Sequence, residues 1–240
     1  MNKSVGAIYY SDFHIDQQLM ATCLKQLKEA FAGEIVSVSL DRPVDLGTNI
    51  VLTGEERGYS TMVKQIITAL ENLTTDHVYF LEHDVLYHAR HFDFTPPRND
   101  TFYYNANNWR WLYPHDYLIT YSNLISLSML CCSRELAFRH YQHRLQHIHD
   151  LGLSEIRSKD PKWARKMGYE PGTKPKHRGG FSDDVHEKWR SELPNIDIRH
   201  RHTFSPPKVH LQSFKHPPEE WREAKIKDIP GWNLREIFEI

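Results

Sequence analysis

Short apolar runs alternate with segments of helical periodicity along the first 85 residues of this chain. The apolar runs are rich in Val, Ile and Tyr and occupy residues 4–10, 34–40, 49–52 and 77–81. Between them, residues 15–31 and 60–73 place apolar side chains at steps of three and four, the spacing of one helix face. We expect Asp16 to cap the first helix and Ser60 or Thr61 to cap the second. This alternation predicts an α/β fold with a mostly parallel sheet covered by helices.

The pattern is less regular after residue 100. We expect a strand at 101–105, a helix at 133–152 and a late strand at 195–200. Residues 153–180 hold prolines, glycines and scattered positive charge, with eight Lys/Arg against two acids between Arg157 and Arg178. Such a composition predicts a mobile loop. We therefore expect residues 1–240 to form a single domain with an irregular C-terminal half.

The composition excludes several classes of protein. A net charge of −1 gives no global basic signal for nucleic acid or membrane binding. Three cysteines cannot supply a disulfide framework, which favours a reducing compartment. No apolar run approaches the roughly 20 residues of a membrane span, and the short apolar run at the N-terminus is too short for a signal peptide. We expect a soluble, cytoplasmic protein.

The segment "HVYFLEHDVLYH" ends an apolar strand on Glu82, His83 and Asp84. Ligands of open α/β sheets sit beyond the carboxyl ends of the strands, so these side chains are placed where a ligand is expected. Carboxylates combined with phosphate oxygens are the preferred surroundings of Mg²⁺, and Mn²⁺ is held in a similar way. The plainer interpretation is that the three residues cap a strand at the surface.

Two further groups of residues could carry chemistry. In "IDIRHRHTF", His200 and His202 follow the late strand, and a histidine there can complete a mixed nitrogen and oxygen metal site. In "GGFSDDVHEKW", Ser182 is a possible cap for a short helix that Asp183 and Asp184 would open. These acids either favour the helix through its dipole or act as a general base. The local sequence leaves both interpretations open.

The order of these three groups resembles that of the GT-A class of nucleotide-sugar glycosyltransferases, whose sheet is Rossmann-like. "EHD" stands where that class carries its Asp-any-Asp metal motif, with the departure that the first acid is Glu82. The resemblance implies that Asp84 and His200 are metal ligands. It also implies that Asp184 is the catalytic base, with Asp183 and Glu187 as rivals that the sequence does not separate.

The chain also resembles a group of short bacterial and phage proteins of this class, through segments between residues 5 and 207. They are "IYYSD", "ERGYSTMVKQI", "EHDVLYHARHFDFTPP", "GYEPGT" and "ELPNIDIRH". By this resemblance residues 1–100 form the nucleotide-binding half and residues 101–240 the acceptor-binding half, with the mobile loop at about 153–180.

The resemblance also implies which residues bind the donor and the acceptor. The donor nucleotide-sugar would be bound by Tyr10, Asp12, Arg57, Glu82, His83 and Asp84. The acceptor would be bound by Trp109, Trp111 and Glu170. Arg57 could instead form a surface salt bridge with Glu55 or Glu56, and either tryptophan could belong to the core.

We therefore expect a glycosyltransferase that uses Mn²⁺ or Mg²⁺ and a nucleotide-sugar, a UDP-sugar by preference. A carboxylate base implies inversion at the sugar carbon. The acceptor could be a glycan, a lipid-linked glycan or a modified DNA base. Two alternatives remain open: a metal-dependent hydrolase or nuclease built on the Asp/His cluster, and a non-catalytic nucleotide-binding module.

Overall fold

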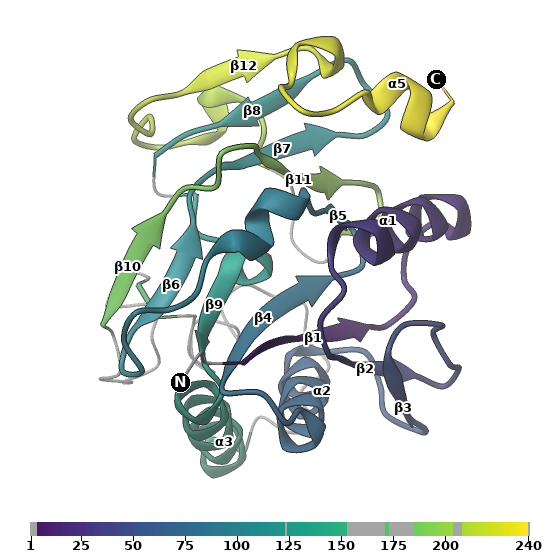
Figure 1. The fold of residues 1–240 in the computed structure, drawn as a ribbon. Coiled ribbons are helices and arrows are strands. Elements are labelled where there is room, and N and C mark those ends of the chain that lie inside the picture. The colour runs from purple at the N-terminus through teal and green to yellow at the C-terminus, as the bar shows by residue number, and fades with distance from the viewer. Residues whose placement is uncertain (1–3, 123, 153–170, 173–184, 204–207, 240) are drawn as a thin grey trace.

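A seven-stranded, mostly parallel sheet forms the centre of the molecule (Figure 1). The computed structural model describes residues 4–122, 124–152, 171–172, 185–203 and 208–239. In sheet order, the strands are β10 (His186–Trp189), β6 (Phe102–Asn105), β9 (Leu130–Ser133), β4 (His77–Glu82), β1 (Val5–Ser11), β2 (Ile35–Leu40) and β3 (Thr48–Leu52). Only β9 runs antiparallel to its neighbours. The predicted α/β fold with a mostly parallel sheet is therefore confirmed.

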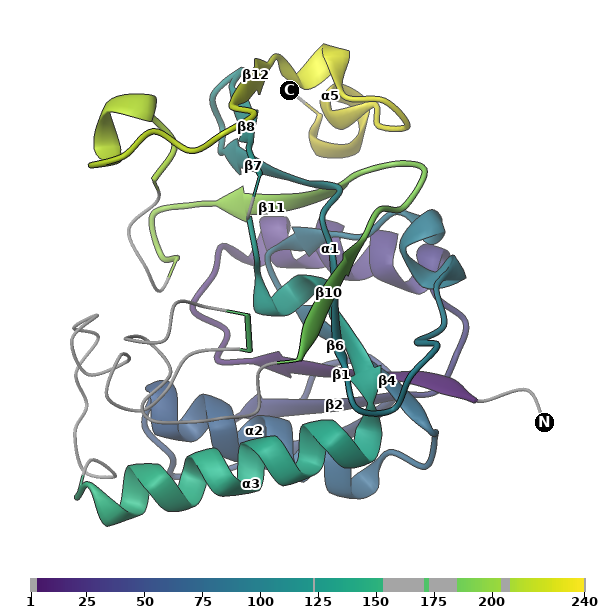
Figure 2. The same cartoon turned by 90° about the vertical axis from the view of Figure 1, so that its left-hand side faces the viewer.

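Helices cover both faces of this sheet, because its strands are apolar on both sides. Helix α1 (Gln17–Ala30) packs with alternate residues of β1 and β4, including Ala7, Tyr9 and Leu81. Helices α2 (Tyr59–Asn72) and α3 (Arg134–Asp150) pack on the opposite face, with Ile8 and Phe80 among others. In Figures 1 and 2, α2 and α3 lie together below the sheet and α1 lies above it.

A second, five-stranded sheet lies beyond α1 and shares its core. In sheet order, its strands are β12 (Arg222–Ala224), β8 (Leu118–Thr120), β7 (Asn108–Leu112), β11 (Asn195–Arg199) and β5 (Val85–Leu86). One buried cluster runs from α1 through Leu86 to Trp111 and Ile198, so both sheets pack on the same apolar side chains. The chain ends in the short helix α5 (Leu234–Phe238). The 3₁₀ turns are η1 (Ala89–Asp93), η2 (Leu127–Met129), η4 (Leu211–Ser213) and η5 (Ile226–Asp228).

Most predicted elements are present, with small shifts at their ends. Asp16 caps α1 as expected, since its carboxylate accepts from the backbone N–H groups of Gln18 and Leu19 at 2.9 and 3.2 Å. The prediction of a Ser60 or Thr61 cap for α2 is wrong, because Gly58 occupies that position and makes no side-chain cap. The short helix expected after residue 183 is also wrong: the described residues there form strand β10, which pairs with β6.

The second sheet was not predicted, apart from its strand β11. Its other strands are short or, like "NWRWL", alternate large rings with polar residues, a pattern for which the sequence suggested a ligand platform or core packing but no strand. All three cysteines are buried, and none of them forms a disulfide. Among the described residues, no helix has both the length and the apolar composition to cross a membrane.

Candidate active site

The candidate site lies at the carboxyl ends of the neighbouring strands β1 and β4. From β1 the chain passes through α1 to β2 and β3 on one side, and then through α2 to β4 on the other side of β1. β1 and β4 are neighbours at the point where the strand order reverses, and in such sheets ligands bind in the crevice outside the carboxyl ends of the strands at this switch point. Ser11, Asp12, Glu82, His83 and Asp84 follow these two ends and line a pocket of about 400 Å³.

Pairing between β5 and β11 brings His200 to this crevice. Val85 lies opposite Asp197, and the backbone N–H of Ile198 donates to the carbonyl oxygen of Asp84 at 2.8 Å. His200 therefore follows directly on a strand that is fastened to Asp84, and its Nε2 lies 3.5 Å from Asp84 Oδ2. With His83 added, one ligand atom of each residue lies within 4.8 Å of the others. The structure thus brings together Asp84 and His200, which are 116 positions apart in the sequence.

The surroundings of these three side chains fit a divalent cation. Two ligands on opposite sides of one Mg²⁺ are about 4 Å apart, so a spread of this size suits a single ion. His200 Nε2 is buried and has no hydrogen-bond partner among the described residues, which a cation would supply. Its Nδ1 accepts a long bond of 3.3 Å from the backbone N–H of His202, so binding at Nε2 requires the other tautomer. His83 Nδ1 is 2.8 Å from the Ser11 hydroxyl.

The two acids of the strand end have opposite electrostatic surroundings. Burial raises the pKa of Asp84, but the neighbouring His200, 3.5 Å away, and the charges of His83 and Arg199 outweigh it and hold that pKa below the ordinary value. Burial and the nearby Asp84 raise the pKa of Glu82 to about 8. The Tyr10 hydroxyl donates to Glu82 Oε1 at 2.6 Å. Asp84 is therefore the carboxylate that can face a cation with a full negative charge.

Arg57 links the pocket to the start of α2. Its Nε donates to Asp12 in a short ion pair, and its Nη2 donates to the carbonyl of His202 at 3.3 Å. Glu55, one of the two acids considered as an alternative partner of Arg57, is paired with Lys64 instead, whose Nζ donates to both of its carboxylate oxygens at 2.8 and 2.9 Å. Burial raises the pKa of Asp12, but the charges of His83 and Arg57 bring it below its usual value. Of the predicted donor residues, all six line the pocket: Tyr10, Asp12, Arg57, Glu82, His83 and Asp84.

Three further arginines in the pocket wall were missed by the sequence analysis. Arg110 on β7 and Arg199 on β11 share the buried carboxylate of Asp197, which lies 3.5 Å from Arg110 Nε and 2.6 Å from Arg199 Nη2. Arg144 comes from α3 and is almost fully buried. The signal was present in the period-two alternation of "NWRWL" and "NIDIR", which puts the charged residues opposite the Trp and Ile side chains. Together with Arg57 they make the pocket suited to an anion such as a diphosphate.

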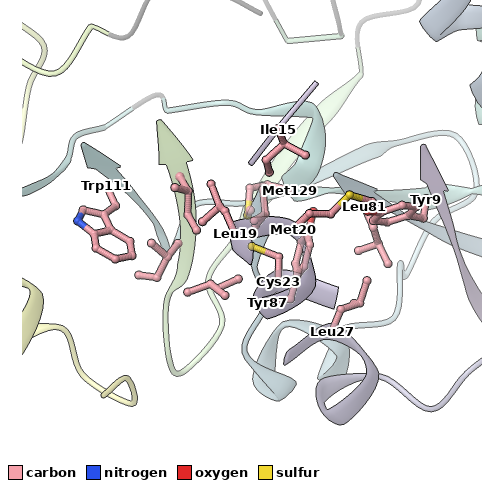
Figure 3. Packing of buried hydrophobic residues seen from close by; sticks show 14 of the residues in the cluster. Tyr9, Ile15, Leu19, Met20, Cys23, Leu27, Leu81, Tyr87, Trp111 and Met129 are labelled. Carbon is pink, nitrogen blue, oxygen red and sulfur yellow. The ribbon is translucent and has the colours of Figure 1, made fainter. Parts of the chain in front are cut away.

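The remaining predicted residues do not line this pocket or are not described. Trp111 is fully buried in the core cluster that also holds Leu19 and Cys23 (Figure 3), and Trp109 is 9% exposed. Core packing, the alternative left open for the tryptophans, thus holds for Trp111. Glu187 lies on the edge strand β10, where it is half exposed and forms a 3.2 Å ion pair with Arg98. Asp183, Asp184 and Glu170 lie outside the described residues, as does nearly all of the 153–180 segment.

No family model and no curated protein matches this chain. Solved structures with a similar fold include the glycosyltransferase GlyE of Streptococcus pneumoniae TIGR4, at 12% identity and a TM-score of 0.38 over 62% of this chain and 39% of that one. The present chain thus spans about two fifths of GlyE. Rv0371c of Mycobacterium tuberculosis H37Rv matches at 11% identity and 0.41, over 82% and 95%. The mannosyltransferase PcManGT of Pyrobaculum calidifontis, solved with GDP-Man and Mn²⁺, matches at 15% identity and 0.39, over 78% and 57%. Likenesses this low give no basis for assigning an activity.

Proposed function

We propose that this chain is a metal-dependent glycosyltransferase that moves a sugar from a nucleotide-sugar to an acceptor hydroxyl. One observation carries the proposal. The His83–Asp84–His200 cluster stands at the switch point of the sheet and opens into a pocket walled by four arginines: Arg57, Arg110, Arg144 and Arg199. A cation site beside guanidinium groups suits a ligand with several phosphate oxygens. That this ligand is a nucleotide-sugar is inferred from the resemblance of the sequence to GT-A glycosyltransferases.

In this proposal each part of the pocket has a role in binding the donor. Asp84, His200 and His83 hold Mn²⁺ or Mg²⁺, which when bound offsets the negative charge that develops on the leaving diphosphate. Arg110 and Arg199 lie close to the cluster, and their positive charge favours the same phosphates. Asp12 and Tyr10, at the end of β1, are placed for the ribose or the base of the nucleotide, with UDP as the preferred case.

The second half of the reaction requires a base for the acceptor hydroxyl. We propose Asp184 for this role and inversion as the outcome, with Asp183 as its nearest rival. Glu187 is the weakest of the three, because its carboxylate is engaged by Arg98 and it does not line the pocket. In this proposal residues 1–100 supply most of the donor side, and the arginines from β7, α3 and β11, which line the same pocket, contribute to donor binding from the second half of the chain.

Calorimetric titration with UDP and GDP, with and without Mn²⁺, tests the proposal. We expect a nucleoside diphosphate to bind in a metal-dependent way and Asp84→Asn to abolish that dependence. His200→Ala should weaken Mn²⁺ binding by at least roughly tenfold to a hundredfold, the loss typical of groups that only support a metal site. His149→Ala, an exposed histidine on α3, is the matched control and should bind as the wild type does.

The outcomes separate the alternatives. Mn²⁺ binding without nucleotide binding would contradict the transferase and favour a metal-dependent hydrolase or nuclease. Nucleotide binding that ignores Mn²⁺, and that His200→Ala leaves unchanged, would favour a binding module. If His202→Ala rather than His200→Ala weakens Mn²⁺ binding, the histidine ligand is wrongly assigned. Release of sugar from a UDP-sugar in the presence of Mn²⁺ is the further readout that a transferase should give.

A further inference from the structure

Three aromatic rings contact one another at the outer edge of the five-stranded sheet, outside both core clusters. Tyr121 follows β8, Phe214 follows η4, and Trp221 precedes β12. The Tyr121 and Trp221 rings are parallel within 11° at 5.8 Å, and Phe214 contacts both rings edge-on, at 5.4 and 5.7 Å. Each ring is half-buried, and within the described residues none of them belongs to either core or packs against one. We call these three residues the aromatic cluster.

The aromatic cluster is not needed to hold residues 214–221 against β8. The segment that carries Phe214 and Trp221 is already tied to β8 by backbone bonds, since Ser122 donates its N–H to the Glu219 carbonyl at 3.0 Å and β12 pairs with β8. Large apolar side chains that stay partly exposed in one patch, outside the core, commonly mark a binding surface. The cluster therefore has the features of a contact site for another molecule.

A hydrogen bond links the aromatic cluster to the wall of the donor pocket. Arg110 lines that pocket, and its Nη1 donates to the Tyr121 hydroxyl at 3.1 Å. The same guanidinium lies 5.9 Å from the centre of the Tyr121 ring. In Figure 2 the yellow-green segment that carries Phe214 projects on the same side of the molecule as the end of β11, from which His200 follows. A molecule lying on the cluster can thus reach the mouth of the pocket.

The charges around the aromatic cluster distinguish between possible occupants. Residues 208–224 carry three Lys/Arg (Lys208, Lys215, Arg222) and three Glu (Glu219, Glu220, Glu223), which leaves no net charge with histidines neutral. Nucleic acids and other polyanions require a clear surplus of Lys and Arg. An uncharged sugar ring does not, and its C–H face complements the negative face of an aromatic ring. Lys208, which lies 5.4 Å from the Phe214 ring, can donate to its hydroxyl groups, whereas Glu223 accepts from the Trp221 indole N–H at 2.8 Å and fixes that ring.

We propose that Tyr121, Phe214 and Trp221 form the acceptor subsite of this chain and bind an uncharged saccharide. The role as acceptor rests on the proposed transferase function, whereas saccharide binding itself does not. This subsite replaces the platform of Trp109 and Trp111 that the sequence suggested, because Trp111 is fully buried and Trp109 nearly so.

Nuclear magnetic resonance of the indole N–H groups tests this subsite with the full chain. The probes are cellotriose, mannotriose and chitotriose, and an oligothymidylate of similar length is the polyanion. We expect at least one trisaccharide to shift the Trp221 indole signal in a saturable way. The Trp232 indole, whose N–H donates to the Pro194 carbonyl at 2.7 Å, is the internal control and should stay in place. Trp221→Phe, which is needed to assign the signal, keeps a ring for stacking.

Affinity for the shifting trisaccharide, measured by calorimetry, completes the test. Trp221→Ala should weaken binding about threefold to tenfold, as the loss of one aromatic contact does, and Trp221→Phe should bind nearly as well as the wild type. The proposal is overturned if no trisaccharide shifts Trp221, if only oligothymidylate does, or if the alanine variant binds unchanged. Nucleotide and Mn²⁺ titrations of the same variants keep the two hypotheses apart. Intact nucleotide binding without saccharide binding would refute the subsite alone, and the reverse would refute the donor site alone.

Discussion

Removal of the Asp197 carboxylate should lower the free energy of unfolding, because Arg110 and Arg199 in the pocket wall would lose the negative charge that they share. Asp197 has a side chain only 4% exposed and lies 2.6 Å from Arg199 Nη2 and 3.5 Å from Arg110 Nε. In Asp197→Ala two neighbouring guanidinium groups lose the charge between them, and breaking such a buried pair costs about 3–5 kcal/mol. Since the arginine side chains keep 16% and 14% exposure on the pocket side, we expect the lower end, about 3 kcal/mol.

Urea unfolding of the two proteins measures this difference in free energy. For a chain of this length about 3 kcal/mol corresponds to a fall in Tm of roughly 6–12 °C. The matched control is Asp45→Ala, which removes a carboxylate 2.7 Å from Lys28 at a fully exposed site and should change stability far less. Adding Arg110→Met to Asp197→Ala removes one of the two repelling charges and should restore part of the loss. If Asp197→Ala costs no more than Asp45→Ala, the buried network contributes nothing.

Three further predictions concern stability and chemistry outside the pocket. Burial lowers the pKa of His91 from 6.5 to about 3, so the unfolded chain binds the proton at a higher pH than the folded protein does, and stability falls as the pH drops below about 6.5. By pH 5 the loss is about 2 kcal/mol. His91→Gln should lose this part of the pH dependence when stability is measured by urea titration. Gly47→Ala should destabilise by at least about 2 kcal/mol, because φ is +56° and the added Cβ would lie 2.1 Å from the Ile35 carbonyl oxygen, whereas Gly54→Ala, at φ +73° with open space around it, should cost only about 1 kcal/mol. All three thiols are buried, so a thiol reagent should label none of them before unfolding; rapid labelling in native buffer would contradict this packing.

The large sheet was predictable from sequence because its elements carry strong local signals. The helices α1, α2 and α3 show apolar residues at helical spacing. β1 and β4 are largely apolar runs, and β2 is rich in the β-branched residues typical of strands. The second sheet carries weaker signals. Its strand β5 has only two residues, Val85 and Leu86, and it exists because β11 pairs with it from far along the chain. A strand that depends on such a distant partner leaves no periodicity of its own to detect.

The candidate site divides in the same way between local and distant information. Glu82, His83 and Asp84 could be placed from sequence because they end a recognisable strand, and the carboxyl end of a parallel strand is a known ligand position. Arg110 and Arg199 could not, since their meeting depends on the parallel register that sets Arg110 opposite Asp197. Arg144 looks like an ordinary surface residue of a charged helix until the fold turns it inward, where it is 3% exposed.

One backbone contact explains why the His83–Asp84–His200 cluster depends on the whole fold. The bond from the Ile198 N–H to the Asp84 carbonyl sets the position at which β11 meets the end of β4. Side chains alternate along a strand, so a slip of one residue in that pairing would turn His200 away from Asp84 and exchange Asp197 with an isoleucine. The apolar face of β11 resists such a slip, because Ile196 and Ile198 are fully buried in the shared core. The position of the histidine is therefore held by hydrophobic packing, and the polar site is a consequence of it.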